Sequence, residues 1–468
     1  MSLSKPETER LTVVIVGAGL VGCIQAIYLT KRGQHVTIYE QLEDPRTWSE
    51  ERARSINLTM SPRGQTALRE IGLEDQIVRS GVLAKGRVVH DGKGNRTHSL
   101  YNEKGEGIVS LKRTKLNAFL VEEAITTYNI PIHFEHSFEK CDATPGDPEG
   151  QETCVFRNKD GEQVTVKADL VIGTDGAHSA VRQEMFNRKK LNFFKQEYHD
   201  HWYTELVVRA GADGKHQMEP DMLHIWPREQ FMLITFPNQN GTFSGTLFMP
   251  AEKFDEILGS KEVLVRFFNA EFPDLVRLVG EDYLRKHFFG EDGHTVKRPG
   301  RLISNEVRPY HSGRSILLLG DAAHAMVPFL GQGMNSGFED CWILDKIFQK
   351  HGYSIETLGL VLDEFSNQRC EEGKAISEMA FEHYVELRSD IAGFSFYVRK
   401  FLDNMLFRVF PDKWVPQYTM VAFTNKPYSE CRLEVERQKR VITWTLISVG
   451  LAFLVTLLAI FLKWCVWP

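Results

Sequence analysis

The chain has 468 residues, of which 42% are hydrophobic and 25% charged, and its formal net charge is −6 at pH 7. This composition is ordinary for a globular protein and excludes a disordered chain, a collagen-like fibre and a small disulfide-stapled domain. The slight acidic excess does not favour a nucleic-acid-binding protein. The cysteine count, seven, is odd and the chain has no C-x-x-C pair, so we predict no disulfide framework, no metal site and a reducing compartment.

The first predicted unit is a strand, a glycine-rich turn, a helix and a second strand. The β-branched run at Thr12–Val16 predicts a buried strand, and the sequence GAGLVG follows it directly at residues 17–22. Residues 23–32 predict a helix, and His35–Tyr39 predicts the second strand, which ends at Glu40. Together these elements predict the βαβ unit of a dinucleotide-binding domain.

The same unit indicates how a dinucleotide would bind. Its glycines allow a tight turn and a close backbone approach to a pyrophosphate, and the helix N-terminus offers free N–H groups to phosphate. Glu40 lies 18 residues after the last glycine, where an acid accepts from a ribose hydroxyl and disfavours a 2′-phosphate. The tightly bound ligand is therefore FAD or NAD rather than NADP, and the candidate residues are Gly17, Gly19, Val21, Gly22 and Glu40.

Two further buried strands end in acidic turns. Residues 168–176, ADLVIGTDG, predict a strand that leads to Asp175, and residues 315–319, SILLL, predict another that leads to Asp321. Each alone is an ordinary strand–turn signal. With the N-terminal unit, however, they form a three-part pattern that resembles the FAD-dependent aromatic hydroxylases in content and order.

This resemblance implies that both acidic turns belong to an FAD site. Asp175 would contact the cofactor, and Asp321 would hold its ribitol or ribose hydroxyls. The glycine-rich stretch at 331–335 would lay backbone N–H groups and a helix N-terminus against the flavin ring, where they stabilise a reduced, anionic flavin. The residues concerned are Gly333, Met334 and Asn335.

Other segments complete the predicted fold. Apolar and polar residues alternate between about 205 and 250, with a turn at 237–241, which predicts a mostly antiparallel sheet. Residues 337–410 are mostly helical in period. The glycine pairs at 92/94 and 105/107 follow no buried strand, so we predict no second dinucleotide domain and expect a nicotinamide cofactor to dock transiently.

The C-terminal segment at 441–462, VITWTLISVGLAFLVTLLAIFL, carries no charge over 22 residues. A helix of this length crosses a hydrocarbon core of about 30 Å at ~1.5 Å per residue. Basic and aromatic residues, which membrane interfaces favour, flank it on both sides: Arg437, Lys439, Arg440, Lys463, Trp464 and Trp467. The segment predicts a single membrane anchor with the large domain in the cytosol, and the alternative is a buried core helix.

The predicted fold class is therefore α/β. It is an FAD-binding, Rossmann-like domain of the aromatic hydroxylase type with an inserted antiparallel β-sheet substrate domain, C-terminal helices and one transmembrane helix. The predicted FAD-binding segments are 8–78, 105–185 and 300–350, the substrate-domain segments are 79–104 and 186–299, the C-terminal helices are 351–436, and the anchor is 441–462.

Longer stretches resemble the kynurenine 3-monooxygenase family over roughly residues 10 to 465. They are RSINL at 54–58, GLEDQIV at 72–78, LHIWPR at 223–228, TLFMP at 246–250, GDAAHAMVPFLGQGMN at 320–335 and YTMV at 418–421. This resemblance implies bound FAD, NADPH as a transient co-substrate, and hydroxylation of L-kynurenine by dioxygen to 3-hydroxy-L-kynurenine through a flavin hydroperoxide, in tryptophan degradation and NAD biosynthesis. It also implies the mitochondrial outer membrane as the location and no catalytic side chain, because the flavin carries the chemistry.

The resemblance also implies site residues. Arg87 matches an arginine that grips the substrate carboxylate through two charge-assisted bonds, and Tyr101 and Tyr418 match tyrosines that donate hydroxyl groups. Apolar pocket positions match Ile225, Phe248, Pro328 and Phe329, and further FAD contacts match Arg54, Thr59 and Arg113. Without the resemblance, Arg87 and Arg113 would be surface charges, the tyrosines packing residues and the apolar positions core; His324 is predicted to be structural.

Three positions depart from the family pattern. The family usually has Asn, which helps bind the substrate carboxylate, where this chain has His383, and Met where it has Leu387. Leu330 stands where the family often carries an aromatic residue or His. His383 can donate a hydrogen bond as well, so we include it among the substrate-binding residues. Two alternatives therefore stay open: a flavin monooxygenase acting on another aromatic amino acid or acid, and a membrane-tethered, non-catalytic flavoprotein.

Overall fold

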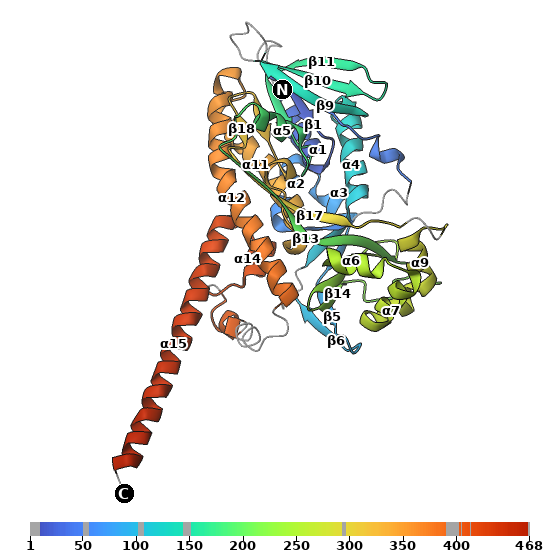
Figure 1. Ribbon diagram of the computed structural model, residues 1–468. Helices are drawn as coiled ribbons and strands as arrows, with labels where there is room; N and C mark the ends of the chain where they lie inside the picture. The colour runs from blue at the N-terminus through green and yellow to red at the C-terminus, as the bar shows by residue number, and fades with distance from the viewer. Residues whose placement is uncertain are drawn as a thin grey trace.

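Two large β-sheets organise the molecule, and one long helix, α15, projects from its body (Figure 1). The computed structural model describes residues 10–49, 56–101, 107–143, 151–292, 296–389, 402–403, 405–411 and 413–466.

A six-stranded, mainly parallel sheet carries the three motifs that predicted an FAD site. Val16 pairs with Tyr39 and with Gly173, and Gly173 pairs with Leu318, so four parallel strands end at the same edge of the sheet. The predicted strands are confirmed and their apolar runs are buried. In sheet order the strands are β18 (His311–Ser312), β19 (Ile316–Leu318), β12 (Leu170–Gly173), β1 (Thr12–Val16), β2 (His35–Tyr39) and β8 (Ile132–His133).

The helix after β1 begins earlier than predicted. α1 spans Leu20–Lys31 rather than 23–32, because Gly19 is its N-cap residue. The last glycine of the motif, Gly22, therefore lies inside the first helical turn, where it packs against the backbone of Gly17.

A seven-stranded sheet forms the second layer, and the predicted antiparallel hairpins between 222 and 250 are confirmed. One pairing was not predicted: β14 lies parallel to β5, which comes from far earlier in the chain. Side chains of one face pack on helices α6 to α9, and alternate side chains line a cavity on the other face. In sheet order the strands are β17 (Gly300–Arg308), β13 (Phe193–Val208), β16 (Phe243–Pro250), β15 (Phe231–Pro237), β14 (Met222–Arg228), β5 (Gly86–His90) and β6 (Arg96–Leu100).

Two three-stranded sheets and a set of helices complete the body. The sheets are β3 (Asn57–Met60), β7 (Ile108–Lys112) and β4 (Val82–Ala84), and β11 (Gln163–Ala168), β10 (Glu152–Asn158) and β9 (His136–Ala143). The other helices are α2 (Pro62–Ile71), α3 (Glu74–Arg79), α4 (Arg113–Thr126), α5 (Ala180–Asn187), α6 (Ala251–Ile257), α7 (Lys261–Glu271), α8 (Pro273–Val279), α9 (Glu281–Phe289), α10 (Asp321–His324), α11 (Gly333–His351), α12 (Ile355–Ser389) and α14 (Gln417–Phe423).

Helix α15 (Tyr428–Val466) has two parts with different surroundings. Buried side chains at helical spacing, from Tyr428 through Cys431 and Val435 to Ile442, face the body and hold its first turns against α12. Beyond them the helix leaves the body (Figure 1), and its most apolar window has a mean hydropathy of 2.6 with none of it buried. The alternative of a buried core helix is therefore wrong, and Tyr428–Leu462 is a candidate membrane span.

Candidate active site

The glycine-rich turn after β1 forms an open cradle at the shared strand edge. Gly17 has a φ of +107°, and a Cβ there would lie 2.8 Å from the carbonyl oxygen of Thr174. A Cβ at Gly22 would lie 2.0 Å from the carbonyl oxygen of Gly17. A Cβ at Gly19, in contrast, would meet nothing within 4 Å. Because no side chain caps α1, the N–H groups of its first turn face this open space, which fits a pyrophosphate.

Glu40 lies beside this cradle, as its spacing predicted. Its two carboxylate oxygens accept from the backbone N–H groups of Ala18, at 2.7 Å, and Leu42, at 2.8 Å. Burial raises the pKa of the Glu40 carboxyl, and these backbone hydrogen bonds oppose that rise. The carboxylate is therefore held against the glycine-rich turn, where a ribose hydroxyl next to a bound pyrophosphate would reach it.

The two acidic turns have different roles. Asp321 opens α10 and lines the cavity between the sheets. Asp175 does not line that cavity; its Oδ2 accepts from the N–H groups of Ala180, at 2.7 Å, and Val181, at 3.2 Å. Burial raises the pKa of the Asp175 carboxyl. Asp175 thus caps α5 and fixes the turn, while Asp321 is the acid that faces the cavity.

A buried ionic cluster supports the turn at Asp321 from behind. Oδ2 of Asp340 accepts from the N–H of Gly320, at 3.0 Å, and lies 2.6 Å from Nε2 of His324. Nε of Arg369 donates to Oδ1 of Asp340 at 2.7 Å. Although burial disfavours the charged carboxylate, His324 and Arg369 hold the pKa of Asp340 below its ordinary value. His324 therefore has a structural contact, as predicted.

The loop before α11 is locked by the side chain of Asn335. Its Nδ2 donates to the carbonyl oxygens of Thr59 and Gly331, each at 2.8 Å, and its Oδ1 accepts from the N–H of Ser61 at 2.9 Å. This side chain is fully buried and does not line the cavity. Asn335 therefore joins the loop to β3, and its neighbours Gly333 and Met334 face the cavity instead.

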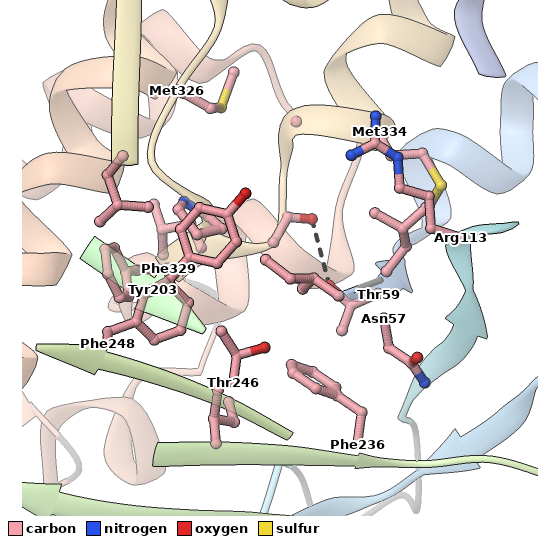
Figure 2. Close-up of a pocket in the computed structure, with 18 of the residues that line it drawn as sticks. Asn57, Thr59, Arg113, Tyr203, Phe236, Thr246, Phe248, Met326, Phe329 and Met334 are labelled. Carbon is pink, nitrogen blue, oxygen red and sulfur yellow. Dashed lines mark hydrogen bonds between the residues drawn. The ribbon is translucent and has the colours of Figure 1, made fainter. Parts of the chain in front are cut away.

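A cavity of about 350 Å³ opens between the two sheets. Figure 2 shows Arg113 beside Met334 at one end, and Tyr203, Phe248 and Phe329 together at the other. The predicted residues that line it are Gly19, Val21, Thr59, Arg87, Tyr101, Arg113, Ile225, Asp321, Pro328, Phe248, Phe329, Gly333, Met334, His383 and Tyr418. Those that do not are Gly17, Gly22, Glu40, Asp175 and Asn335, and Arg54 lies outside the described residues.

The polar end of the cavity is built around Arg87. Its guanidinium carbon lies 5.0 Å from the ring centre of Tyr418 and 5.4 Å from that of Tyr101. The two tyrosine rings stack at 5.6 Å, and the ring of His383 lies 6.2 Å from that of Tyr418. Burial raises the pKa of Tyr101 well above its ordinary value, so its hydroxyl stays protonated and can donate. Within the described part of the chain the side chain of Arg87 has no ion pair and no hydrogen bond, so its charge is available to an anionic ligand.

The other walls are aromatic and aliphatic. The rings of Phe248 and Phe329 lie 4.8 Å apart, and Phe329 stacks on Tyr384 at 4.2 Å. The sequence reasoning missed several wall residues, although the alternation in β13 to β16 and the loop before α11 could have indicated them: Tyr203, Met232, Ile234, Phe236, Thr246 and Met326. A flat aromatic ligand with a carboxylate fits these surroundings. Within the described residues no group of three or more His, Cys, Asp or Glu side chains is arranged to hold a metal ion.

Comparisons with known proteins identify the family and the fold of the chain. A family model described as an FAD binding domain matches residues 10–261 and 273–371. The chain is 40% identical over 445 residues to kynurenine 3-monooxygenase of Anopheles gambiae, covering 95% of this chain and 88% of the relative. It is 37% identical to the Sus scrofa protein of that name, covering 96% and 91%, and 38% identical to that of Myxococcus xanthus, covering 90% and 88%.

Solved structures confirm the predicted fold class. The tetrameric form of 2-methyl-3-hydroxypyridine-5-carboxylic acid oxygenase superposes with a TM-score of 0.61 at 19% identity, over 81% of this chain and 91% of that one. PqsL of P. aeruginosa, in complex with 2-aminobenzoylacetate, superposes with a TM-score of 0.61 at 18% identity, over 81% and 97%. At these identities the likeness concerns the fold alone.

Proposed function

This chain belongs to the kynurenine 3-monooxygenase family, and from that membership we propose that it hydroxylates the aromatic ring of L-kynurenine to 3-hydroxy-L-kynurenine. It is an FAD-dependent monooxygenase that uses NADPH and dioxygen. One oxygen atom enters the ring ortho to the amine, the other leaves as water, and NADPH is oxidised to NADP⁺. The observation that carries the proposal is the unpaired guanidinium of Arg87 at the polar end of an aromatic cavity beside a dinucleotide cradle.

The residues present fit FAD. The first turn of α1 at Gly19 would hold the pyrophosphate, Glu40 the ribose, and Asp321 further hydroxyl groups. Backbone at Gly333 and Met334 would face the flavin ring, with Arg113 beside it. When bound there, FAD supplies the transfer of electrons from NADPH to dioxygen and of one oxygen atom to the substrate.

The side chains around the substrate bind and orient it. Arg87 would form a forked pair with the carboxylate, while the hydroxyls of Tyr101 and Tyr418 would donate to the same end. His383 contributes a further polar ring beside Tyr418. The apolar wall that includes Ile225, Phe248, Pro328 and Phe329 would hold the ring and keep water from the reacting atoms. Substrate choice then depends on the polar end, and reactivity depends on exclusion of water at the aromatic end.

The C-terminal helix supports a proposal about where the protein is located in the cell. We propose that α15 anchors the protein in the mitochondrial outer membrane and leaves the body in the cytosol. The basic residues Arg437, Lys439 and Arg440 stand on the body side of the charge-free segment, which is the side that faces the cytosol for most membrane helices.

The test is NADPH oxidation by detergent-solubilised, FAD-loaded protein with and without L-kynurenine, together with mass detection of the hydroxylated product. We expect kynurenine to stimulate oxidation and one 3-hydroxykynurenine to form for each NADPH consumed. Stimulation without product would make kynurenine an effector that uncouples the reaction. Absence of stimulation would contradict the substrate assignment, and a panel of other aromatic acids would then identify the substrate of a related monooxygenase. Bound FAD that NADPH never reduces, with any compound of the panel, would contradict the enzyme itself.

A further inference from the structure

A short segment between α12 and α14 exposes apolar side chains beside the projecting helix. Met405 to Val409 are helical, and Phe410 ends this turn with its N–H donating to the carbonyl of Leu406 at 2.8 Å. The exposed fractions are 43% for Met405, 61% for Val409 and 50% for Phe410. Three large apolar side chains clustered this way on a surface indicate a contact with an apolar partner.

Residues that follow this turn in the sequence fix the segment to α15 by hydrogen bonds. Nη2 of Arg437 donates to the carbonyl of Lys413 at 3.2 Å, and Nε2 of Gln438 donates to the carbonyl of Val415 at 3.1 Å. Trp414 is buried between them, and its Nε1 donates to Oδ1 of Asp403 at 3.0 Å. The apolar side chains are therefore held at a defined position along the axis of α15.

That position coincides with the start of the charge-free part of α15. Gln438 precedes Val441 by three residues, which is about 5 Å along a helix axis. Exposed cations, Arg408 and Lys413, lie in the same segment, and Arg440 lies next to it in sequence on α15. Two acids of the described residues at this level are paired with cations: Glu434 with Arg437 and Glu382 with Lys439. Basic and aromatic side chains around an apolar helix are what the headgroup region of a bilayer favours.

We propose that residues 405–411 and 413–415, which we call the surface segment, are a second membrane contact. In it Met405, Val409 and Phe410 enter the headgroup region of the bilayer that α15 crosses, and Arg408 and Lys413 face anionic lipid. This inference rests on the proposed anchor and goes beyond it, since a single helix can anchor a body without further contact. The partner is the lipid surface because hydrogen bonds hold the segment against the helix that is proposed to span the bilayer.

The contact also reaches the active site. The surface segment leads through Pro416, the N-cap residue of α14, directly to Tyr418 at the polar end of the cavity. Lipid contact at Val409 and Phe410 would therefore hold the segment that positions this tyrosine. The bilayer would then help to hold the substrate site in place.

The test uses the full chain, loaded with FAD, in nanodiscs of phosphatidylcholine and phosphatidylserine. Single cysteines are introduced by Phe410→Cys in the surface segment, Val449→Cys in α15 and Leu360→Cys on α12, and each is labelled with an environment-sensitive fluorophore. Leu360 is the matched control because it is 59% exposed but lies on the first turns of α12, far from the residues of α12 that pair with α15. Cys23, Cys141, Cys154, Cys341, Cys370 and Cys431 are buried, and the unsubstituted protein measures the remaining background, including that of Cys465.

Lipids with a nitroxide on the headgroup or deep in the acyl chain then report depth. We expect a blue shift and loss of emission for F410C, greater with the headgroup nitroxide, and greater loss for V449C with the acyl-chain nitroxide. L360C should respond to neither. Quenching of V449C without any effect on F410C would overturn the second contact and leave the anchor intact. A blue shift of F410C without quenching would overturn it in favour of a second protein copy. No quenching at V449C would instead contradict the anchor itself.

Discussion

In the proposed function, Arg87 is the residue on which substrate recognition depends most directly. It lies on β5, near the rings of Tyr101 and Tyr418 and without an acidic partner in the described part of the chain. Arg87 is half-buried. A partly desolvated cation without a counter-ion is unfavourable, so a site that keeps one is suited to bind an anion. The sequence alone could not distinguish this arginine from a solvated strand residue, because its setting depends on the pairing of β5 with β14.

We expect Arg87→Ala to raise KM for L-kynurenine and to abolish most substrate-stimulated NADPH oxidation while FAD stays bound. A hydrogen bond to a charged group contributes about 1.5–3 kcal/mol, which corresponds to roughly a 10- to 150-fold weaker binding. Steady-state kinetics and the flavin absorbance of the purified variant measure both effects.

The matched control is Arg96→Ala on the neighbouring strand β6, where the arginine pairs with Glu219 at the surface and does not line the cavity. Equal turnover in the Arg87 and Arg96 variants would remove Arg87 from the carboxylate site.

Asp340 provides a pH-dependent contribution to stability. Because His324 and Arg369 hold its folded pKa below the ordinary value of 3.8, this stabilisation is present above that value and disappears as the pH falls through the lower folded pKa. Asp340→Asn leaves Arg369 without this partner in a buried site, so we expect the variant to lose about 3–5 kcal/mol at pH 7.

Urea unfolding at pH 7, 5 and 3 measures this loss. The difference between wild type and variant should stay constant from pH 7 to 5 and shrink below 3.8. Asp142→Asn, in an exposed pair with Lys140, is the control and should change little. A difference that is the same at every pH would show that Asp340 acts by packing instead.

At the scale of elements, the periodicity of apolar residues predicted which segments are strands but not which distant strands pair. The apolar runs of β1, β2, β12 and β19 were sufficient to identify them, as was the turn between β15 and β16. The parallel pairing of β14 with β5 could not be predicted, because it joins residues more than 130 positions apart and no local pattern encodes it. For the same reason the locking role of Asn335 was missed, since its partners lie on and just after β3.

Two substitutions in the glycine-rich turn before α1 should separate the effect on ligand binding from the effect on folding. A methyl group at Gly19 enters open space, whereas one at Gly22 collides with backbone. We therefore expect Gly19→Ala to keep the thermal stability of the FAD-free protein but to weaken FAD binding about tenfold or more, a loss of at least ~1.4 kcal/mol. Gly22→Ala should lower the melting temperature of the FAD-free protein itself. Melting curves and FAD titration of both variants measure the two effects, and unchanged FAD affinity in Gly19→Ala would contradict the cradle.

Helix α15 contacts the loop that faces the flavin site. The hydroxyl of Tyr428 donates to Oε1 of Gln332 at 3.0 Å, and the guanidinium of Arg63 lies 3.9 Å above the Tyr428 ring. We expect Tyr428→Phe to lose about 1 kcal/mol of stability and to release more hydrogen peroxide per NADPH, because Gln332 loses its partner and the loop becomes less well held. The matched control is Tyr28→Phe, whose hydroxyl donates to the carbonyl of Ala67 on α2 and not to this loop. Equal peroxide yields in both variants would restrict Tyr428 to a packing role.

At the scale of the whole molecule, the active site is assembled from nearly the full length of the chain. The cavity takes residues from Gly19 to Tyr418, and both large sheets contribute. The order of the three FAD motifs allowed the nucleotide-binding sheet to be predicted. The shape of the cavity could not be, since it depends on how the second sheet and α14 close over the first.

We expect truncation to separate anchoring from catalysis. A chain ending at residue 440 lacks the charge-free segment but keeps Tyr418 and Tyr428. It should be released from membranes and keep kynurenine-stimulated NADPH oxidation, with a higher KM than the full chain in a bilayer because lipid no longer supports the surface segment. A chain ending at residue 411 lacks both tyrosines and should lose substrate-stimulated NADPH oxidation. Membrane flotation and the kynurenine assay measure the two properties, and full activity in the shorter chain would exclude α14 from the site.

The continuity of α15 has a mechanical consequence. The helix runs for 39 residues, about 58 Å, and no proline or glycine interrupts it between the body and Val441. A protein tethered by a flexible linker can tumble freely above its membrane, but in the proposed anchored state this body is joined to the bilayer by an uninterrupted helix. Its cavity therefore keeps a constant orientation to the bilayer plane, and any tilt of the helix turns the whole body with it. Small molecules then approach the cavity from a fixed direction relative to the membrane. Membrane thickness and curvature would therefore affect how readily the substrate reaches the cavity.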